Sequence, residues 1–278
     1  MIIGITGKNA AGKTEVCNYL ISRGFEFFSL SDEIRGEIRR RGQEITRGLL
    51  IAVGNELRSK LGVRAEVLAA DLTRDADLKA VEDRIASADN LEFLLNNAGF
   101  GTAGRFWEAS VEAHDAMHRL HVLATVRLTH AALKRMTARG RGAVVNVSSV
   151  AAFICRPGNT SYYATKSWMN GFSEGLYLEL KSARSPVRVQ ALCPGYTVTE
   201  FHDVMGFDRG LAPRSWWMSA EKVVDASLAG LRRGDLMVVP GWRYKLLVIL
   251  LRVMPRFLKH AAATLGPSSI RREAKVLE

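Results

Sequence analysis

The chain has 278 residues, of which 47% are hydrophobic and 24% are charged, and its formal net charge is +11. This composition excludes a disordered or fibrous chain, and the length allows one large α/β domain or two small ones. The positive charge suits acidic small ligands such as nucleotides. The sequence carries no stripe of aromatic and basic residues of the kind that binds nucleic acid, so we expect no nucleic-acid partner.

Short apolar runs alternate with longer amphipathic stretches along the chain. The expected strands are Ile2–Thr6, Glu26–Leu30, Ala65–Ala69, Leu91–Asn96, Ala143–Ser148, Val187–Leu192 and Leu236–Val239. Helical patterns fill the intervals between them. Strands and helices in alternation predict right-handed βαβ units, so we expect an α/β fold with a doubly wound parallel sheet, a Rossmann-like three-layer sandwich.

The first expected strand runs into a glycine-bounded loop that opens a helix. Residues 7–14 read G-K-N-A-A-G-K-T, which fits the G-x-x-x-x-G-K-T pattern of a phosphate-binding P-loop, or Walker A motif. In such a loop the backbone N–H groups between Gly7 and Gly12 cradle a phosphate, Lys13 reaches the terminal phosphates and Thr14 holds Mg²⁺. This stretch therefore predicts a nucleotide site, with ATP and Mg²⁺ as candidate ligands.

Two helical patterns fill the interval between the second and third expected strands, although a crossover usually needs only one helix. Together with the P-loop, this segment resembles nucleoside-monophosphate and dephospho-coenzyme-A kinases, in which two helices form the acceptor-binding arm. The resemblance covers Met1–Gly62. It implies that Asp32, Arg35 and Arg47 face the acceptor of a phosphoryl group.

Five short motifs follow in order after the later strands. They are Asp71-Leu72, Asn96-Asn97-Ala98-Gly99, Ser149, Tyr162-x-x-x-Lys166 and Pro194-Gly195-Tyr196-Thr197-Val198-Thr199. Each motif is weak alone, but their order and spacing together resemble the short-chain dehydrogenase/reductase family from about Val63 onward. The resemblance implies an NAD(P)-dependent oxidoreductase that transfers hydride between a nicotinamide and a ketone or secondary alcohol.

Three of these residues form the expected catalytic set. Tyr162 and Lys166 are four residues apart and share one helix face. The lysine cation is expected to lower the pKa of the tyrosine toward neutrality, so that Tyr162 can give a proton to a carbonyl oxygen or take one back. Ser149 can donate a hydrogen bond to the same oxygen. A local turn or cap bond is the alternative for Ser149, and we expect such a bond for Ser148 beside it.

The other motif residues are expected to hold the dinucleotide at the carboxyl ends of the strands. The resemblance implies that Lys166 also holds the nicotinamide ribose and that Asp71 accepts from the adenine amino group. A cap of the following helix is the alternative role for Asp71, and both roles are compatible. The expected cofactor contacts are Gly7, Gly12, Lys13, Thr14, Asp71, Leu72, Asn97, Ala98, Gly99, Tyr162, Lys166, Pro194, Gly195, Thr197 and Thr199.

One position departs from the family pattern. The resemblance implies an asparagine that holds a water in a proton relay to the active-site lysine, but this chain has His121 there. A histidine also donates and accepts hydrogen bonds and titrates near neutral pH, so His121 joins the catalytic candidates. Further on, Phe201–Trp217 is rich in aromatic and Met side chains. The resemblance implies a mobile flap there, which suits an apolar and bulky substrate.

The two resemblances meet near Gly62-Val63, so the sequence predicts a chimera of a kinase-like segment (1–62) and a dehydrogenase-like remainder (63–278) within one α/β domain. The second strand is then expected beside the first, as in dehydrogenases. We expect an oxidoreductase that uses NADP, with NAD as the alternative, and that forms a homo-oligomer, as family members commonly do. The alternative functions are P-loop nucleotide binding or phosphotransfer, and an inactive chimera.

The remaining sequence features concern location and partners. Cys17, Cys155 and Cys193 are far apart and show no metal-ligand spacing, so we expect a reducing, cytoplasmic setting and no metal centre. The start of the chain shows no secretion signal. The apolar run Leu246–Leu251 is too short to span a bilayer. A packed helix is expected there, and contact with a membrane surface or a second copy is the alternative.

Overall fold

The computed structural model describes residues 2–5, 27–28, 68, 70–102, 104–199 and 213–265. The strands are β1 (Ile2–Ile5), β2 (Phe27–Phe28), β3 (Leu91–Asn96), β4 (Ala143–Val147), β5 (Arg188–Leu192) and β6 (Met237–Val238). The helices are α4 (Asp75–Ala86), α5 (Val111–His118), α6 (Thr125–Arg139), α7 (Thr160–Ser182), α9 (Ala220–Arg233), α10 (Trp242–Val253) and α11 (Arg256–Leu265), with short turns η1 (Arg119–Ala124), η2 (Val150–Phe153) and η4 (Arg214–Trp216). Among these, no helix is long and apolar enough to cross a membrane.

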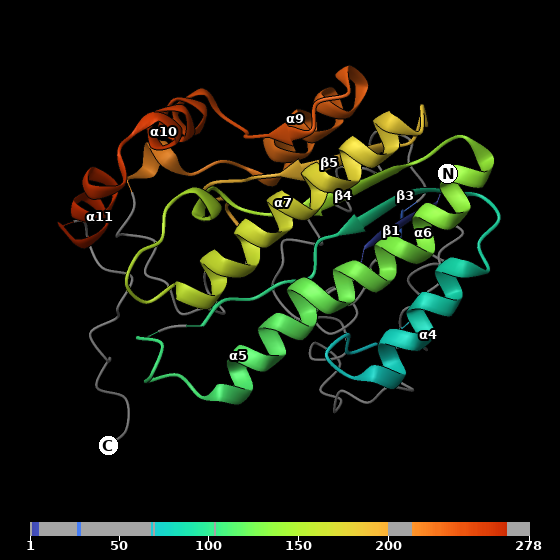
Figure 1. Cartoon of the computed structure of the whole chain (residues 1–278), viewed down its shortest axis with the longest axis horizontal. Coiled ribbons are helices and arrows are strands. Elements are labelled where there is room, and N and C mark those ends of the chain that lie inside the picture. Colours follow the sequence, from blue (N-terminus) through green and yellow to red (C-terminus); the bar gives the residue numbers. More distant parts are fainter. Residues whose placement is uncertain are drawn as a thin grey trace, which may run out of the picture.

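The described strands form one six-stranded parallel sheet in the order β2-β1-β3-β4-β5-β6 (Figure 1). The strand order reverses at β1, which marks a doubly wound sheet. The predicted α/β class is therefore confirmed, and so is the place of the second strand beside the first. The expected strand Ala65–Ala69 lies mostly outside the described residues, and Leu68 within it has no regular secondary structure.

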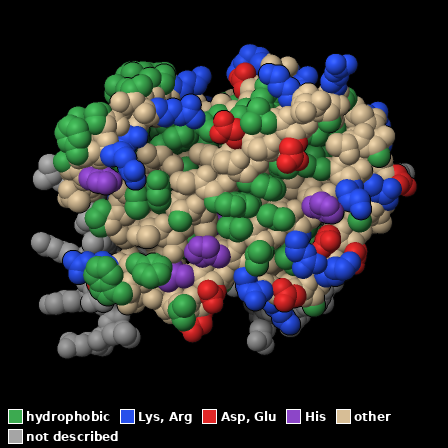
Figure 2. All heavy atoms as spheres, in the orientation of Figure 1, with side chains coloured by type: hydrophobic (Ala, Val, Ile, Leu, Met, Phe, Trp, Pro, Cys, Tyr) green, Lys and Arg blue, Asp and Glu red, His purple; other side chains and the backbone are tan. Residues whose placement is uncertain are grey.

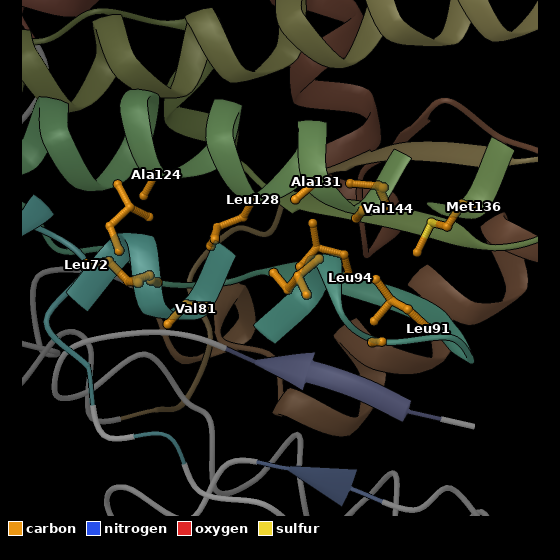
Figure 3. Close-up of a cluster of buried hydrophobic side chains, with 14 of the residues drawn as sticks. Leu72, Val81, Leu91, Leu94, Ala124, Leu128, Ala131, Met136 and Val144 are labelled. Atoms are coloured by element: carbon orange, nitrogen blue, oxygen red, sulfur yellow. The ribbon is translucent and has the colours of Figure 1, made fainter. Parts of the chain in front are cut away.

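Helices cover both faces of the sheet, and β4 shows how its residues serve both. Val144 belongs to the apolar cluster shared with α4 and α6, whereas Ala143 and Val145 belong to the cluster shared with α9. Figure 3 shows Val144 with Leu94 of β3 and Leu128 of α6 in the first cluster. A strand that is buried on both faces reads as a continuous apolar run, which is why this region is so rich in valine.

Local signals fix the ends of several helices. The Ser110 hydroxyl accepts a hydrogen bond from the N–H of Ala113 at 3.2 Å and so caps α5. α6 and α9 end at Gly140 (φ 66°) and Gly234 (φ 80°), whose left-handed backbone favours glycine. Between α5 and α6 the helix widens into one π-helical stretch, η1. Such insertions often occur at functional sites, and η1 contains His121.

Candidate active site

The residues of the candidate site converge at the carboxyl ends of three neighbouring strands. The parallel register pairs Asn96 at the end of β3 with Asn146 of β4, and Asn146 with Ala191 of β5. The loops that follow these strands therefore open at the same edge of the sheet. This is the edge at which ligands bind in doubly wound sheets, as the sequence predicts for the cofactor.

The turn of α7 that carries the lysine is fastened to the end of β4. Lys166 is buried, and its Nζ donates a hydrogen bond to the carbonyl of Val147 at 2.7 Å. Ser148 is also buried and donates to the carbonyl of Lys166 at 3.0 Å. The expected local turn for Ser148 is therefore replaced by a bond between strand and helix. Tyr162 lies one helical turn away, with its ring centroid 5.6 Å from the Nζ of Lys166.

Ser149 and Tyr162 are brought together as predicted. The Ser149 side chain forms a hydrogen bond with the Tyr162 side chain. The same hydroxyl oxygen accepts from the N–H of Ala151 at 3.1 Å, which caps η2. The cap bond that was the alternative to catalysis is thus present as well, and it orients the serine toward the phenol.

The pKa values in this group differ from the sequence-based expectation. Burial raises the pKa of Tyr162 to about 12, against the opposing hydrogen bond with Ser149. Burial lowers the pKa of Lys166 to about 8, and a smaller electrostatic interaction with Cys193 opposes this shift. The expectation that Lys166 lowers the tyrosine pKa toward neutrality is therefore wrong for this structure. The loss of phenolate hydration on burial raises the pKa more than the hydrogen bond with Ser149 lowers it. The phenol therefore remains protonated at neutral pH.

His121 lies fully buried in η1, between the loop after β3 and α7. Its Nε2 accepts a hydrogen bond from the N–H of Phe100 at 3.2 Å, and its Nδ1 lies 2.9 Å from the hydroxyl of Thr165. Because Nε2 is an acceptor, we assign the proton to Nδ1, which then donates to Thr165. Burial, followed by the charge of Lys166, lowers the pKa of His121 well below its usual value. The imidazole is therefore neutral, and both of its nitrogens hold protein groups.

The loop after β3 approaches the catalytic group closely. A Cβ atom on Gly99 would lie 2.9 Å from His121 Nε2 and 3.5 Å from Lys166 Nζ. Ala98 is buried beside it, and the N–H of Asn97 donates to the carbonyl of Leu95 at 3.1 Å. The sequence analysis named Gly99 as a cofactor contact. The structure gives a further reason for glycine at this position, because a side chain there would collide with His121.

Asp71 and Leu72 have local roles in the described chain. An Asp71 carboxylate oxygen accepts from the N–H of Thr73 at 3.1 Å and from its hydroxyl at 2.7 Å. The cap residue of α4 is Arg74, so the alternative prediction that Asp71 caps this helix is wrong. Leu72 is buried in the apolar core. The cofactor contacts predicted for Asp71 and Leu72 remain predictions.

The loop after β5 packs against a residue that sequence reasoning missed, Tyr244 of α10. Its hydroxyl accepts from the N–H of Tyr196 at 2.9 Å and donates to the carbonyl of Trp216 at 2.8 Å. A Cβ atom on Gly195 would lie 2.0 Å from the Tyr244 ring. Gly195 is therefore required by this aromatic ring. Only a long-range contact creates the requirement, and no sequence motif signals it.

The other predicted residues of this loop stay near the same edge. Thr197 donates from its hydroxyl to the carbonyl of Gly195 at 3.1 Å, and Thr199 is buried. In the predicted flap, residues 201–212 lie outside the described part of the chain. Its last residues pack on the loop: Trp217 lies 5.3 Å from Tyr196, and Trp216 meets Tyr244 edge to face at 5.1 Å.

A buried polar network beneath the site was also missed. The Asn96 amide donates to Asn146 at 2.8 Å and to Thr129 at 2.9 Å, and Asn146 donates to Ser173 of α7 at 2.9 Å. The signal in the sequence was an asparagine inside the apolar run 143–147. These bonds tie β3, β4 and α7 together directly under the catalytic group.

The arrangement fits the nicotinamide end of a dinucleotide. The bond from Lys166 to Val147 uses one ammonium hydrogen, and the described residues supply no acceptor for the other two. The backbone at Gly99 runs beside this ammonium. A ribose hydroxyl is an acceptor that suits such a donor. Within the described ranges, no group of three or more His, Cys, Asp or Glu side chains could hold a metal ion.

Comparisons with known proteins decide the family. A family model described as short chain dehydrogenase matches residues 43–207. The chain belongs to the short-chain dehydrogenase family. This confirms the prediction of an NAD(P)-dependent oxidoreductase of the short-chain dehydrogenase type.

Three relatives of this short-chain dehydrogenase are informative. The putative oxidoreductase SadH of Mycobacterium tuberculosis is 30% identical over 194 residues, 65% of this chain and 69% of SadH. A short-chain dehydrogenase from Sphingobium yanoikuyae in complex with NADPH matches 92% of this chain and 96% of its own, with 30% identity and a TM-score of 0.72. The bulky-bulky ketone specific alcohol dehydrogenase from Comamonas testosteroni matches 92% of this chain and 95% of its own, with 28% identity and a TM-score of 0.69. Alignments with the first curated relatives span 60%, 78% and 69% of those proteins.

The comparisons do not support a kinase-like front end. The short-chain dehydrogenase match begins at residue 43, inside the segment 1–62 that the sequence likened to a kinase. The Sphingobium structure covers more of this chain than residues 63–278 alone could supply. The predicted junction near Gly62-Val63, the chimera and the P-loop alternative therefore lack support. The predicted loop contacts lie outside the described residues, namely Gly7, Gly12, Lys13 and Thr14.

Proposed function

We propose that this short-chain dehydrogenase reduces bulky, apolar ketones with NADPH, or oxidises the corresponding secondary alcohols. The observation that carries the proposal is the hydrogen bond between Ser149 and a protonated Tyr162, with Lys166 buried one helical turn away. These groups stand at the ligand-binding edge of a doubly wound sheet.

The proposed mechanism starts from a protonated phenol. A nicotinamide dinucleotide, when bound, would supply the hydride for the carbonyl carbon. As negative charge develops on the carbonyl oxygen, Ser149 donates a hydrogen bond to it and Tyr162 transfers its proton to it. Because the pKa of Tyr162 is about 12, the acid needed for ketone reduction is fully present at neutral pH. The ammonium of Lys166, which lies 5.6 Å from the Tyr162 ring centroid, stabilises the phenolate that remains.

NADP(H) is the proposed cofactor, with NAD(H) as the alternative. The Sphingobium relative was solved with NADPH, and the net charge of +11 favours the dinucleotide with the extra phosphate. Lys166 would hold the nicotinamide ribose beside the backbone of Asn97–Gly99. The other proposed contacts are Gly7, Gly12, Lys13, Thr14, Asp71, Leu72, Tyr162, Pro194, Gly195, Thr197 and Thr199.

The proposed substrate class follows from the aromatic surroundings of the loop after β5. Trp216, Trp217 and Met218 stand beside this loop, and the backbone of Met218 pairs with that of Tyr196 and Val198. The Comamonas relative is specific for bulky-bulky ketones. Both observations support a substrate with apolar groups on each side of the carbonyl. We also propose that the enzyme is a homo-oligomer, which sedimentation velocity would test.

His121 is proposed as a positioning residue that acts through Phe100 and Thr165. Replacing it with asparagine, which also donates and accepts, should keep kcat within about tenfold of the wild type. Leucine should lower kcat by more than tenfold, because the N–H of Phe100 then loses its acceptor, while KM for NADPH changes little. Equal kcat for the asparagine and leucine variants would contradict the assignment.

The test of the proposed function compares wild type with Tyr162→Phe. The wild type should bind NADPH and reduce a diaryl ketone with a higher kcat/KM than acetone. The variant lacks the proton donor, so kcat should fall by about 10²- to 10⁴-fold. NADPH binding, followed by nicotinamide fluorescence, should persist in the variant. Turnover by Tyr162→Phe at the wild-type rate would overturn the proposed chemistry, and a preference for acetone would overturn the substrate class.

A further inference from the structure

Helix α10 has an apolar face that packs on the protein. Tyr244, Val248 and Leu251 are all buried, and Tyr244 is fixed by its bonds to the loops that it contacts. This part of the sequence-based expectation, a packed C-terminal helix, is therefore present in the described chain. The packed face accounts for three of the nine apolar residues in the helix.

The opposite face of α10 is also apolar, and it is exposed. Its members, with exposed fractions, are Trp242 (69%), Leu246 (50%), Ile249 (58%), Leu250 (49%) and Val253 (75%). At 3.6 residues per turn these positions fall within an arc of about 100°. Two more exposed apolar side chains follow in the first turn of α11, where Phe257 is 71% and Leu258 46% exposed. We call these seven side chains the α10–α11 face.

Among Lys, Arg, Asp and Glu, the helices α10 and α11 themselves contain only the basic residues. On α10, Arg243 lies on one side of the arc, and Lys245 and Arg252 lie on the other. Arg256 and Lys259 add two positive charges on α11, and the sequence has no Asp or Glu between Asp235 and Glu273. Figure 2 shows hydrophobic and basic side chains gathered over the helices that Figure 1 labels α10 and α11.

We propose that the α10–α11 face docks on the surface of an anionic phospholipid bilayer, with α10 lying in the plane of the interface. An exposed apolar stripe with an aromatic residue at each end and basic residues along its edges is the pattern of an interfacial helix. The apolar side chains would enter the boundary between headgroups and acyl chains. The flanking Lys and Arg side chains would meet lipid phosphates at the negatively charged surface.

Charge argues for lipid over a second copy of this chain. In a two-fold contact the same surface meets itself, so Arg243, Lys245 and Arg252 would approach their own copies without an acidic partner. Like charges brought together in an interface oppose association. An anionic bilayer offers both the apolar phase and the opposite charge.

The α10–α11 face is also connected to the candidate site. Tyr244 of α10 holds the N–H of Tyr196, and Arg243 donates to the carbonyl of Ser215 beside Trp216. Docking would therefore bring the loop after β5 close to the lipid, where apolar ketones concentrate. This consequence rests on the proposed function, whereas the docking itself does not.

The test uses the full chain and vesicles of phosphatidylcholine with or without phosphatidylglycerol. The wild type should co-sediment with the anionic vesicles, bind the neutral vesicles more weakly and be released by high salt. The double variant Trp242→Ser/Ile249→Ser should bind at least about tenfold more weakly, because two exposed apolar groups are removed from the face. Reversing charge in Lys245→Glu/Arg252→Glu should abolish the preference for anionic lipid.

The chain supplies a matched control on other elements. Trp107 is 76% exposed and Leu178 57%, and these exposed fractions are similar to those of Trp242 and Ile249. Arg105 lies over the ring of Trp107, as Arg243 lies over the ring of Trp242. Trp107→Ser/Leu178→Ser should bind vesicles like the wild type. All variants should melt near the wild-type temperature, since exposed substitutions change stability little.

Three results would overturn the proposal. One is the absence of wild-type binding to any of the vesicles, and another is equal loss of binding in the face and control variants. The third is a face variant that sediments as a smaller assembly than the wild type in the absence of lipid, which would assign the face to contact between copies. None of these tests measures turnover. A negative result would therefore overturn the docking proposal and leave the proposed reductase function untouched.

Discussion

Lys166 donates a hydrogen bond from its buried ammonium to the backbone carbonyl of Val147, at 2.7 Å. The bond joins the catalytic turn of α7 to the end of β4, and Ser148 adds a second bond between the same two elements. Burial of this ammonium lowers its pKa to about 8. Its protonation state therefore changes within the range in which dehydrogenases are assayed.

The first prediction concerns the pH dependence of the two directions. Tyr162, with a pKa of about 12, is protonated throughout the neutral range, so ketone reduction needs no titration of the phenol. The ammonium of Lys166 is lost as the pH rises through about 8, so kcat/KM for reduction should be flat below that pH and fall above it. Alcohol oxidation needs the phenolate and should accelerate with rising pH.

Lys166→Arg serves as the control for this profile. Arginine stays charged far above pH 8, so any activity that remains should lack the alkaline fall in reduction. Steady-state kinetics in both directions across the pH range provide the measurement. A wild-type reduction profile that stays flat well above pH 8 would contradict the assigned role of Lys166.

The second prediction concerns stability at alkaline pH. Between about pH 8 and 10.5 the unfolded chain keeps a proton on Lys166 that the folded chain has lost, so the free energy of unfolding should rise across this window. The shift corresponds to roughly 3 kcal/mol at most. Lys166→Met should not show this rise. Urea unfolding at several pH values measures it, and parallel curves for the two proteins would refute the buried-charge interpretation.

The catalytic group was predictable because its spacing is local. Tyr162 and Lys166 share a helix face by their separation of four, and parallel strands bring Ser149 to the same edge. The pKa of Tyr162 was not predictable, because it depends on how deeply the phenol is buried. The neutral state of His121 likewise follows from burial and from its contacts with Phe100 and Thr165.

The requirement for Gly195 shows why other parts could not be read from the sequence. The sequence analysis named this glycine only as an expected cofactor contact, whereas the structure packs it against the ring of Tyr244, which comes from α10. Contacts between residues so far apart depend on the packed fold. The P-loop pattern at residues 7–14 illustrates the opposite error, since a short local match suggested a family that the comparisons do not support.

The third prediction tests the contact between Gly195 and Tyr244. Gly195→Ala places a methyl group 2.0 Å from the ring, so the free energy of unfolding should fall by about 1–3 kcal/mol or more. Combining it with Tyr244→Ala should cost less than the sum of the single changes, because the second change removes the clash. Gly171→Ala is the control. Its Cβ would meet nothing within 4 Å in α7, so it should stabilise by about 0.5–1 kcal/mol. Additive losses would contradict the contact.

The last prediction concerns the buried imidazole of His121 at acid pH. Its pKa in the folded chain is well below the value of about 6.5 expected when the chain is unfolded. Below that pH the unfolded chain takes up a proton that the folded chain does not, so the free energy of unfolding should fall as the pH falls, by up to about 1.4 kcal/mol per pH unit.

His121→Asn removes the titrating group. The decrease in its free energy of unfolding between neutral pH and about pH 5 should therefore be smaller than that of the wild type. Chemical denaturation at both pH values provides the measurement, with His260→Asn as the control for replacing an exposed imidazole by asparagine. Equal acid sensitivity of wild type and His121→Asn would show that the imidazole takes up its proton as readily in the folded chain as in the unfolded one.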